Sequence, residues 1–175
     1  MQSVKVVVTG PFNAGKTTFI KSVSEITVLS TERQISDVAG EGSGETTVAM
    51  DFGRITVSDD VVLYLFGTPG QSRFSFMWET LSEGMLGFVL LVDATERATF
   101  ADAKEMIGFF SEMSDVPFVV AANKVEADDV DTIRTIRTDL ELADSVPLLP
   151  VDARNKESVK AVLLGLLYEI LESMG

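Results

Sequence analysis

The feature that most constrains this chain is the stretch 10–17, which reads GPFNAGKT. It follows a β-rich apolar run at 4–9 and opens a segment, 15–25, whose apolar residues recur at helical spacing. The stretch matches the pattern G-x-x-x-x-G-K-S/T, a motif that requires a strand before it and a helix after it. Its two glycines allow the backbone to curl, so that successive N–H groups point at one anion. The sequence therefore predicts a phosphate-binding loop between the first strand and the first helix.

The side chains of this loop suit a nucleotide polyphosphate with a metal ion. Lys16 can bridge β- and γ-phosphate oxygens, and the Thr17 hydroxyl can bind Mg²⁺. Phe12 is bulky for a residue near the γ-phosphate, and it either only covers the nucleotide or alters catalysis. The alternative for the whole stretch is a glycine turn that merely joins strand to helix. The other residues expected to contact the nucleotide here are Asn13, Ala14, Gly15 and Thr18.

Apolar runs alternate with segments of helical period along the rest of the chain. This alternation predicts an α/β fold, a doubly wound and mostly parallel six-stranded sheet with about five helices. We expect strands at 4–9, 47–57, 61–65, 87–92, 116–121 and 147–151, and helices at 15–25, around 100–110, at 131–142 and at 156–173. The segment 28–46 is expected to be a long loop, and 71–83 an irregular segment. No repeat or linker interrupts the chain, which predicts one domain over residues 1–175.

The charge balance and the missing residue types exclude several classes of function. The chain has 27 acidic and 14 basic residues, which gives a formal net charge of −13. Such a surface repels nucleic-acid phosphates and anionic lipid, so we expect no nucleic-acid partner. The absence of cysteine and histidine excludes disulfides, thiolate metal sites and Ser-His-Asp triads. No apolar run is long enough to cross a bilayer, and we expect a cytoplasmic protein without direct membrane insertion.

Four further stretches fall in the order and spacing of the motifs of Ras-like small GTPases. They are TTVAMDF at 46–52, FGTPGQ at 66–71, NKVE at 123–126 and VDAR at 151–154. The longer segments TTVAMDFGRI and LYLFGTPGQSRFSFMW, together with VDAR, are most similar to the bacterial conservon-type GTP-binding proteins, which are relatives of MglA. The resemblance covers essentially the whole chain. It implies a small-GTPase domain that binds GTP or GDP with Mg²⁺ and hydrolyses GTP as a molecular switch, slowly when alone.

At the phosphate end, the resemblance implies roles for the first two of these motifs. Thr47, with Thr46 as the alternative, would reach Mg²⁺ and the γ-phosphate. The N–H group of Gly70 would contact the γ-phosphate, and the amide of Gln71 would orient the attacking water. Gly67 departs from the usual family, which carries at this position an aspartate that holds Mg²⁺ through water. The loss of that carboxylate should weaken metal binding, although Thr17, Thr47 and the phosphates still supply ligands.

At the base end, the resemblance implies that Asn123 meets the purine, that Lys124 packs over the base, and that the Ala153 N–H meets guanine O6. Glu126 replaces the family's aspartate that accepts from guanine, and Asp128 is a second possible acceptor. A carboxylate here favours guanine because adenine offers no donors at those two positions. The residues implied at the base are Asn123, Lys124, Glu126, Asp152, Ala153 and Arg154.

Hydrolysis needs positive charge beside the phosphates, which an arginine often completes. Arg73 is the candidate in this chain and Arg54 a second one, so the expected catalytic set is Gln71, Lys16, Gly70 and Arg73. The segments 28–47 and 67–82 are the expected switches, where the resemblance implies a Roadblock-type regulatory protein, or another GTPase-activating protein or effector. The second switch carries five large apolar residues that either face a partner or pack in the core: Phe74, Phe76, Met77, Trp78 and Leu81.

Two other functions remain open on this sequence. A nucleotide-binding scaffold without useful hydrolysis would agree with Phe12 in the phosphate loop and with Gly67 in place of aspartate. An ATP-using P-loop phosphotransferase would need an acceptor lid and an adenine pocket, and neither is recognisable in the chain. A GTP-hydrolysing switch is the first expectation because Gln71 directly follows Gly70.

Overall fold

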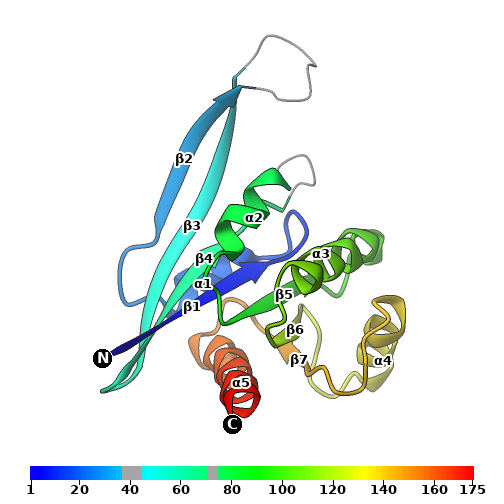
Figure 1. Ribbon diagram of the computed structural model, residues 1–175. Coiled ribbons are helices and arrows are strands. Elements are labelled where there is room, and N and C mark those ends of the chain that lie inside the picture. Colours follow the sequence, from blue (N-terminus) through cyan, green and yellow to red (C-terminus); the bar gives the residue numbers. More distant parts are fainter. Residues whose placement is uncertain (37–44, 71–74) are drawn as a thin grey trace.

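The computed structural model describes residues 1–36, 45–70 and 75–175, with the backbone alone over 29–36 and 45–49. In these ranges seven strands form one sheet in the order β2-β3-β4-β1-β5-β6-β7 (Figure 1). The strands are β1 (Gln2–Thr9), β2 (Leu29–Ser36), β3 (Glu45–Ser58), β4 (Val61–Gly67), β5 (Gly87–Asp93), β6 (Phe118–Asn123) and β7 (Leu148–Val151). The pairs β1–β4, β1–β5, β5–β6 and β6–β7 are parallel, whereas β3 is antiparallel to both β2 and β4.

Helices cover both faces of this sheet. They are α1 (Lys16–Val23), α2 (Phe76–Ser82), the short 3₁₀ helix η2 (Arg97–Thr99), α3 (Phe100–Met113), α4 (Val130–Asp139) and α5 (Lys156–Met174). The helices α1 and α5 bury apolar residues in one core cluster, and α2, α3 and α4 do so in a second cluster. None of the helices in the described ranges is long and apolar enough to span a membrane.

The central strands alternate between the two clusters, as side chains of a strand point to opposite faces. Val6 and Val8 of β1 belong to the cluster under α1 and α5, whereas Val7 belongs to the cluster under α2 and α3. The β5 residues Phe88 and Leu90 join the second cluster in the same way. The unbroken apolar character of these strands therefore follows from a sheet that is buried on both faces.

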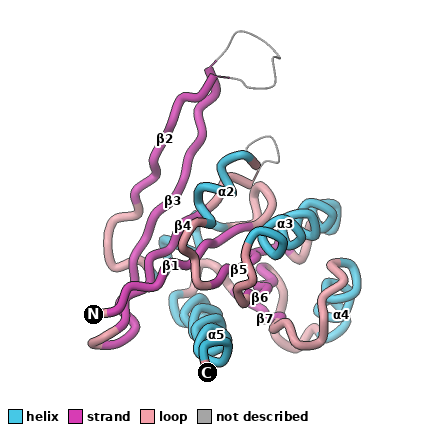
Figure 2. The backbone as a smooth tube through the Cα atoms, in the orientation of Figure 1, coloured by secondary structure: helices cyan, strands magenta, loops and turns pink. Residues whose placement is uncertain are grey.

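The fold class predicted from the sequence, a doubly wound and mostly parallel α/β sheet, is confirmed. Two local expectations were wrong. Residues 29–36 are not loop but form β2, which pairs with β3 from Leu29 opposite Phe52 to Ser36 opposite Glu45. The sequence LSTERQIS of β2 shows no hydrophobic period, and backbone pairing with β3, which does not depend on such a period, defines the strand. Residues 76–82 form the helix α2. Figure 2 shows the β2–β3 hairpin extending past the helices.

The parallel strands bring the predicted motifs to one edge of the sheet. Thr9 at the end of β1 lies opposite Leu90 of β5, and Asp93 at the end of β5 lies opposite Asn123. Asn123 in turn lies opposite Val151 at the end of β7. Ligands of open α/β sheets bind at such carboxyl edges, where neighbouring strands continue in opposite directions across the sheet. In this sheet the change of direction occurs at β1, which lies between β4 and β5.

Candidate nucleotide-binding site

The stretch 10–17 forms a tight loop between β1 and α1, as the sequence predicts. Gly10 and Gly15 have φ angles of 151° and 107°, and Asn13 between them has a φ of 67°. A Cβ atom on Gly10 would lie 2.2 Å from the Leu91 backbone oxygen, and one on Gly15 would lie 2.7 Å from Asn123 Nδ2. Both glycines are therefore required by close contacts with β5 and β6 as well as by backbone conformation.

The Lys16 amine is enclosed by this loop. Its Nζ donates to the backbone oxygens of Gly10 at 2.5 Å and Pro11 at 2.9 Å. Burial lowers the pKa of Lys16 to about 8, although the nearby Asp51 carboxylate acts in the opposite direction. The amine thus lies at the place where the motif expects phosphate oxygens, and an anion there would give it a charged partner in place of the two carbonyls.

Thr17, the expected Mg²⁺ ligand, is bonded to a residue that the sequence motifs did not single out. Its Oγ1 donates to Asp51 Oδ2 at 2.5 Å. Asp51 belongs to β3 and lies directly opposite Gly67 of β4 in the antiparallel register. Reading motifs along the chain misses Asp51, but the predicted hairpin of 47–57 with 61–65 contains the information, because its register fixes which residues face each other.

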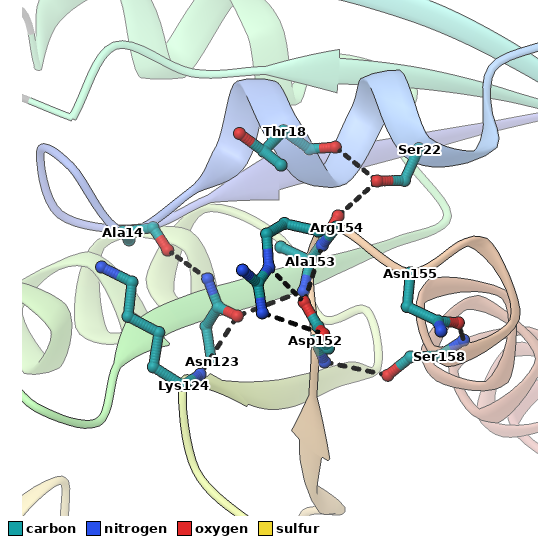
Figure 3. A network of polar contacts seen from close by, with 10 residues as sticks. All are labelled: Ala14, Thr18, Ser22, Asn123, Lys124, Asp152, Ala153, Arg154, Asn155 and Ser158. Carbon is teal, nitrogen blue, oxygen red and sulfur yellow. Dashed lines mark hydrogen bonds and ion pairs between the residues drawn. The ribbon is translucent and has the colours of Figure 1, made fainter.

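Asn123 joins three of the predicted motifs (Figure 3). Its Nδ2 donates to the Ala14 oxygen of the phosphate loop at 3.2 Å. Its Oδ1 accepts from the backbone N–H of Ala153 and from that of Lys124, each at 3.1 Å. The side chain is buried, so these bonds replace contacts with water. The residues predicted to read a base are therefore held next to those predicted to hold phosphates.

The Ala153 N–H and the Asn123 amide thus have partners inside the protein. The sequence expectation gave the first to guanine O6 and the second to the purine, and those contacts stay predictions. Ala153 is further fixed by its backbone oxygen, which accepts from the Ser22 hydroxyl of α1. Asp152 and Arg154, on either side of Ala153, form an exposed ion pair with Nε 3.1 Å from Oδ1, which lowers the pKa of Asp152.

Lys124 is held by Asp93, a residue outside the predicted motifs. Its Nζ lies 2.8 Å from Oδ2 of Asp93, at the end of β5, and its backbone has a φ of 65°. Burial by itself would raise the pKa of Asp93, but hydrogen bonds from Lys124 and Thr95 outweigh burial and hold that pKa below its usual value. Glu126 and Asp128, the two expected base acceptors, are both exposed.

The segment after β4 packs against the phosphate loop. A Cβ atom on Gly70 would lie 2.6 Å from the Phe12 backbone nitrogen and 2.7 Å from Lys16 Nζ, so only glycine fits there. Phe12 itself is 58% exposed. The Trp78 indole donates from Nε1 to the Pro69 oxygen at 2.9 Å, which ties α2 to the residue before Gly70.

The remaining expected switch residues are only partly visible. Gln71, Arg73 and Phe74 lie outside the described residues, and so does the part 37–44 of the first switch. The backbones of Thr46 and Thr47 belong to β3 and pair with Ile35 and Gln34 of β2. In the second switch Trp78 is buried and Phe76 is exposed, whereas Met77 and Leu81 are half-buried. The apolar residues there thus divide between the core and the surface.

Arg54, the second arginine candidate, lies away from the loop. Its backbone contacts Ser24 and Glu25, which follow the last residue of α1, whereas the phosphate loop precedes the first. Its Nε is buried without a hydrogen-bond partner among the described residues. This position does not suit a role beside the phosphates.

Comparison with known proteins gives a family for this arrangement. The family described as conserved hypothetical ATP binding protein matches residues 8–173. Uncharacterized protein MJ1339 of Methanocaldococcus jannaschii is 34% identical over 129 residues, which cover 74% of this chain and 75% of that protein. These likenesses agree with a nucleotide-binding P-loop at residues 10–17.

More distant similarity reaches two named groups. Ypt/Rab-type GTPase YPT7 of Saccharomyces cerevisiae is 27% identical over 169 residues, covering 89% of this chain and 76% of that GTPase. Translation initiation factor IF-2 of Rickettsia bellii is 26% identical over 159 residues, and the match spans 86% of this chain but only 18% of the factor. The similarity therefore supports the P-loop GTPase superfamily as the wider group.

Proposed function

Since this chain belongs to the family of conserved hypothetical ATP binding proteins, we propose that its P-loop binds GTP or GDP and that it hydrolyses GTP as a molecular switch. The observation that carries the proposal is the junction at Asn123, which joins the phosphate loop to the segments 123–126 and 151–154. One nucleotide could then place its phosphates on residues 10–17 and its base on the two other segments.

Guanine is the proposed base because carboxylates are available to accept from it. Glu126 is exposed and follows Lys124, which Asp93 holds in place, by two residues, and Asp128 is exposed two residues later. Guanine presents two neighbouring N–H donors to such a group, and adenine presents none at the same positions. ATP is the alternative, and the naming of the family as ATP binding proteins favours it. Displacement of labelled GDP by ATP as readily as by GTP would support that alternative.

The metal that accompanies such nucleotides is Mg²⁺, and the donors present suit it. Among the described residues no group of three acidic or histidine side chains could hold a metal by itself. Mg²⁺ at phosphate sites takes one or two carboxylates, hydroxyls, water and the phosphates themselves. Thr17 would hold it through its hydroxyl, and Thr47 is the proposed second hydroxyl. When bound, the ion supplies positive charge that offsets the charge of the phosphates.

The chain's own residues would then act by position and charge. Lys16 would leave the Gly10 and Pro11 carbonyls and place its ammonium on the phosphate oxygens. The Gly70 N–H, next to the phosphate loop, would donate to the γ-phosphate. Gln71 would orient the attacking water, and Arg73 is the proposed positive charge for the transition state.

Regulation is proposed at the segments 28–47 and 67–82. Loss of the γ-phosphate would release contacts at Thr47 and Gly70, and a partner would bind differently to the two conformations of these segments. By likeness to the conservon and MglA group, a Roadblock-type protein, or another GTPase-activating protein or effector, is the proposed partner in the cytoplasm. The exposed Phe76 in the second segment could contribute to its surface.

Single-turnover GTP cleavage tests the proposal. We expect slow phosphate release by the pure protein with Mg²⁺, and a decrease of at least tenfold in Gln71→Ala, because one water-orienting group is lost. Gln2→Ala serves as the control, since it removes the same amide from the exposed start of β1. If the wild type cleaves no GTP, alone or with a partner, the result would favour a nucleotide-binding scaffold without useful hydrolysis. Equal rates in wild type and Gln71→Ala would remove the assigned role of Gln71.

A further inference from the structure

The position of Gly67 leaves a gap in the proposed site. At the end of β4 there is no side chain to act on Mg²⁺ from beside Thr17, although carboxylates usually assist at such sites. The antiparallel pairing places Asp51 of β3 directly across from Gly67. We propose that Asp51 supplies from the neighbouring strand the carboxylate that stabilises Mg²⁺ at Thr17. The inference rests on the proposed nucleotide-binding function.

The contact between Asp51 and Thr17 has the geometry that this role needs. Thr17 Oγ1 donates its proton to Asp51 Oδ2 at 2.5 Å. A hydroxyl has one proton and two lone pairs, so donating the proton to Asp51 leaves the lone pairs for a cation. Asp51 therefore orients the hydroxyl of Thr17, and its own negative charge lies 2.5 Å from the oxygen that would hold the ion. Partners of this kind fix the orientation of metal ligands and add to their affinity.

The space around Gly67 explains why the carboxylate sits on β3 in this chain. A Cβ atom on Gly67 would lie 3.3 Å from the Cβ of Asp51 and 3.6 Å from its Oδ2. It would also lie 3.0 Å from Cδ1 of Ile20 in α1. A side chain at position 67 would thus compete with that of Asp51 for one space. The strand pair holds one carboxylate at this place, and the glycine makes room for it.

The charge around Asp51 agrees with a cation site of this kind. The Asp51 carboxylate accepts a hydrogen bond from Thr17, and its negative charge also attracts the buried amine of Lys16. When the Lys16 ammonium moves to phosphate oxygens, the negative charge of Asp51 remains beside the Thr17 hydroxyl. A single carboxylate with a hydroxyl and phosphates is a donor set that suits Mg²⁺, which keeps several waters in such sites.

The test is the Mg²⁺ dependence of GDP release, measured with GDP that carries a fluorescent label. For the wild type we expect Mg²⁺ to slow release, with a midpoint at a defined free Mg²⁺ concentration. Asp51→Asn keeps the shape and an acceptor oxygen but removes the charge. We expect it to raise that midpoint by about 10- to 100-fold, the usual effect of losing a residue that supports a metal ligand. In excess EDTA the two proteins should release GDP at similar rates.

Asp59→Asn is the matched control, because Asp59 is exposed in the turn between β3 and β4 and the substitution removes the same charge. Its midpoint should equal that of the wild type. The double variant Asp51→Ala with Gly67→Asp returns a carboxylate to the shared space from the other strand. We expect its midpoint to lie closer to the wild type than that of Asp51→Asn. A midpoint for the double variant as high as that of Asp51→Asn would contradict the inference that a carboxylate at position 67 can occupy the same space as that of Asp51.

The outcomes separate this inference from the function on which it rests. If the wild type fails to bind labelled GDP, the proposed nucleotide site is wrong. If it binds GDP and Asp51→Asn changes the Mg²⁺ midpoint by less than twofold, the site stands and the role of Asp51 is overturned. If Asp59→Asn shifts the Mg²⁺ midpoint as much as Asp51→Asn does, the cause is the loss of one negative charge from the protein in general. That result would also overturn the role of Asp51.

Discussion

Lys16 shows how one residue links the folding of the ligand-free protein to its proposed chemistry. Its amine is buried and donates to the Gly10 and Pro11 carbonyls. Burial disfavours the charged form of a lysine, which is why its pKa lies at about 8 instead of 10.5. A buried ammonium group is unfavourable unless an anion binds beside it. The site therefore favours the binding of phosphate oxygens.

This burial predicts a dependence of stability on pH. Between pH 8 and pH 10.5 the unfolded chain keeps the Lys16 proton and the ligand-free folded protein does not, so the free energy of unfolding should rise with pH. The rise from this group is about 3 kcal/mol over the range, and below pH 8 its contribution is constant. Urea unfolding of the wild type and of Lys16→Met measures the difference, since the variant lacks the titrating group. Parallel pH curves for the two proteins would show that the Lys16 pKa is not lowered.

At the scale of elements, α2 is fixed to the phosphate loop through one peptide. The Trp78 indole donates to the Pro69 oxygen, and its ring packs against Phe109 and Phe110 of α3, with ring centroids 5.3 and 5.9 Å away. The Pro69 carbonyl and the Gly70 N–H belong to the same planar peptide unit. The hydrogen bond from Trp78 therefore also restricts the direction of the N–H that is proposed to meet the γ-phosphate.

Trp78→Phe keeps an aromatic ring in the core but removes this hydrogen bond. We expect it to slow single-turnover GTP cleavage by about tenfold, or roughly 1.4 kcal/mol of barrier, with GDP affinity little changed. The Pro69 carbonyl loses its hydrogen-bond donor, which should also lower the free energy of unfolding by about 1–3 kcal/mol. Phe118→Leu is the control, because Phe118 packs in the same core through Phe88 without contacting this peptide. Cleavage rates that fall equally in both variants would assign the effect to the core and not to the peptide.

The sequence predicts some of these elements better than others. Strands β5 and β6 are apolar up to their last residues, Asp93 and Asn123, because both faces are buried, and this pattern is visible in the chain itself. Strand β2 has no such pattern, since its residues LSTERQIS are mostly polar. The motifs likewise singled out Gly70 and Asn123, whose roles toward a nucleotide stay predictions. They did not single out Asp51, whose position depends on the register of two strands, or Asp93, whose contact with Lys124 only the structure shows.

At the scale of the whole molecule, the sheet gathers distant parts of the chain around one proposed ligand. The phosphate loop at 10–17, the segment at 123–126 and the segment at 151–154 follow three different strands and are joined at Asn123. The acidic protein, with its net charge of −13, offers a nucleotide phosphate little attraction at long range. Binding must therefore rest on the local N–H groups of the loop, the start of α1 and Lys16.

The most direct test is a crystal structure of the protein with GDP and Mg²⁺. We expect the β-phosphate inside the loop at 10–17, with the Lys16 ammonium moved from the backbone carbonyls to phosphate oxygens. We also expect the guanine between the segments at 123–126 and 151–154. An empty loop at saturating GDP, or a nucleotide bound elsewhere on the protein, would contradict the proposed nucleotide site.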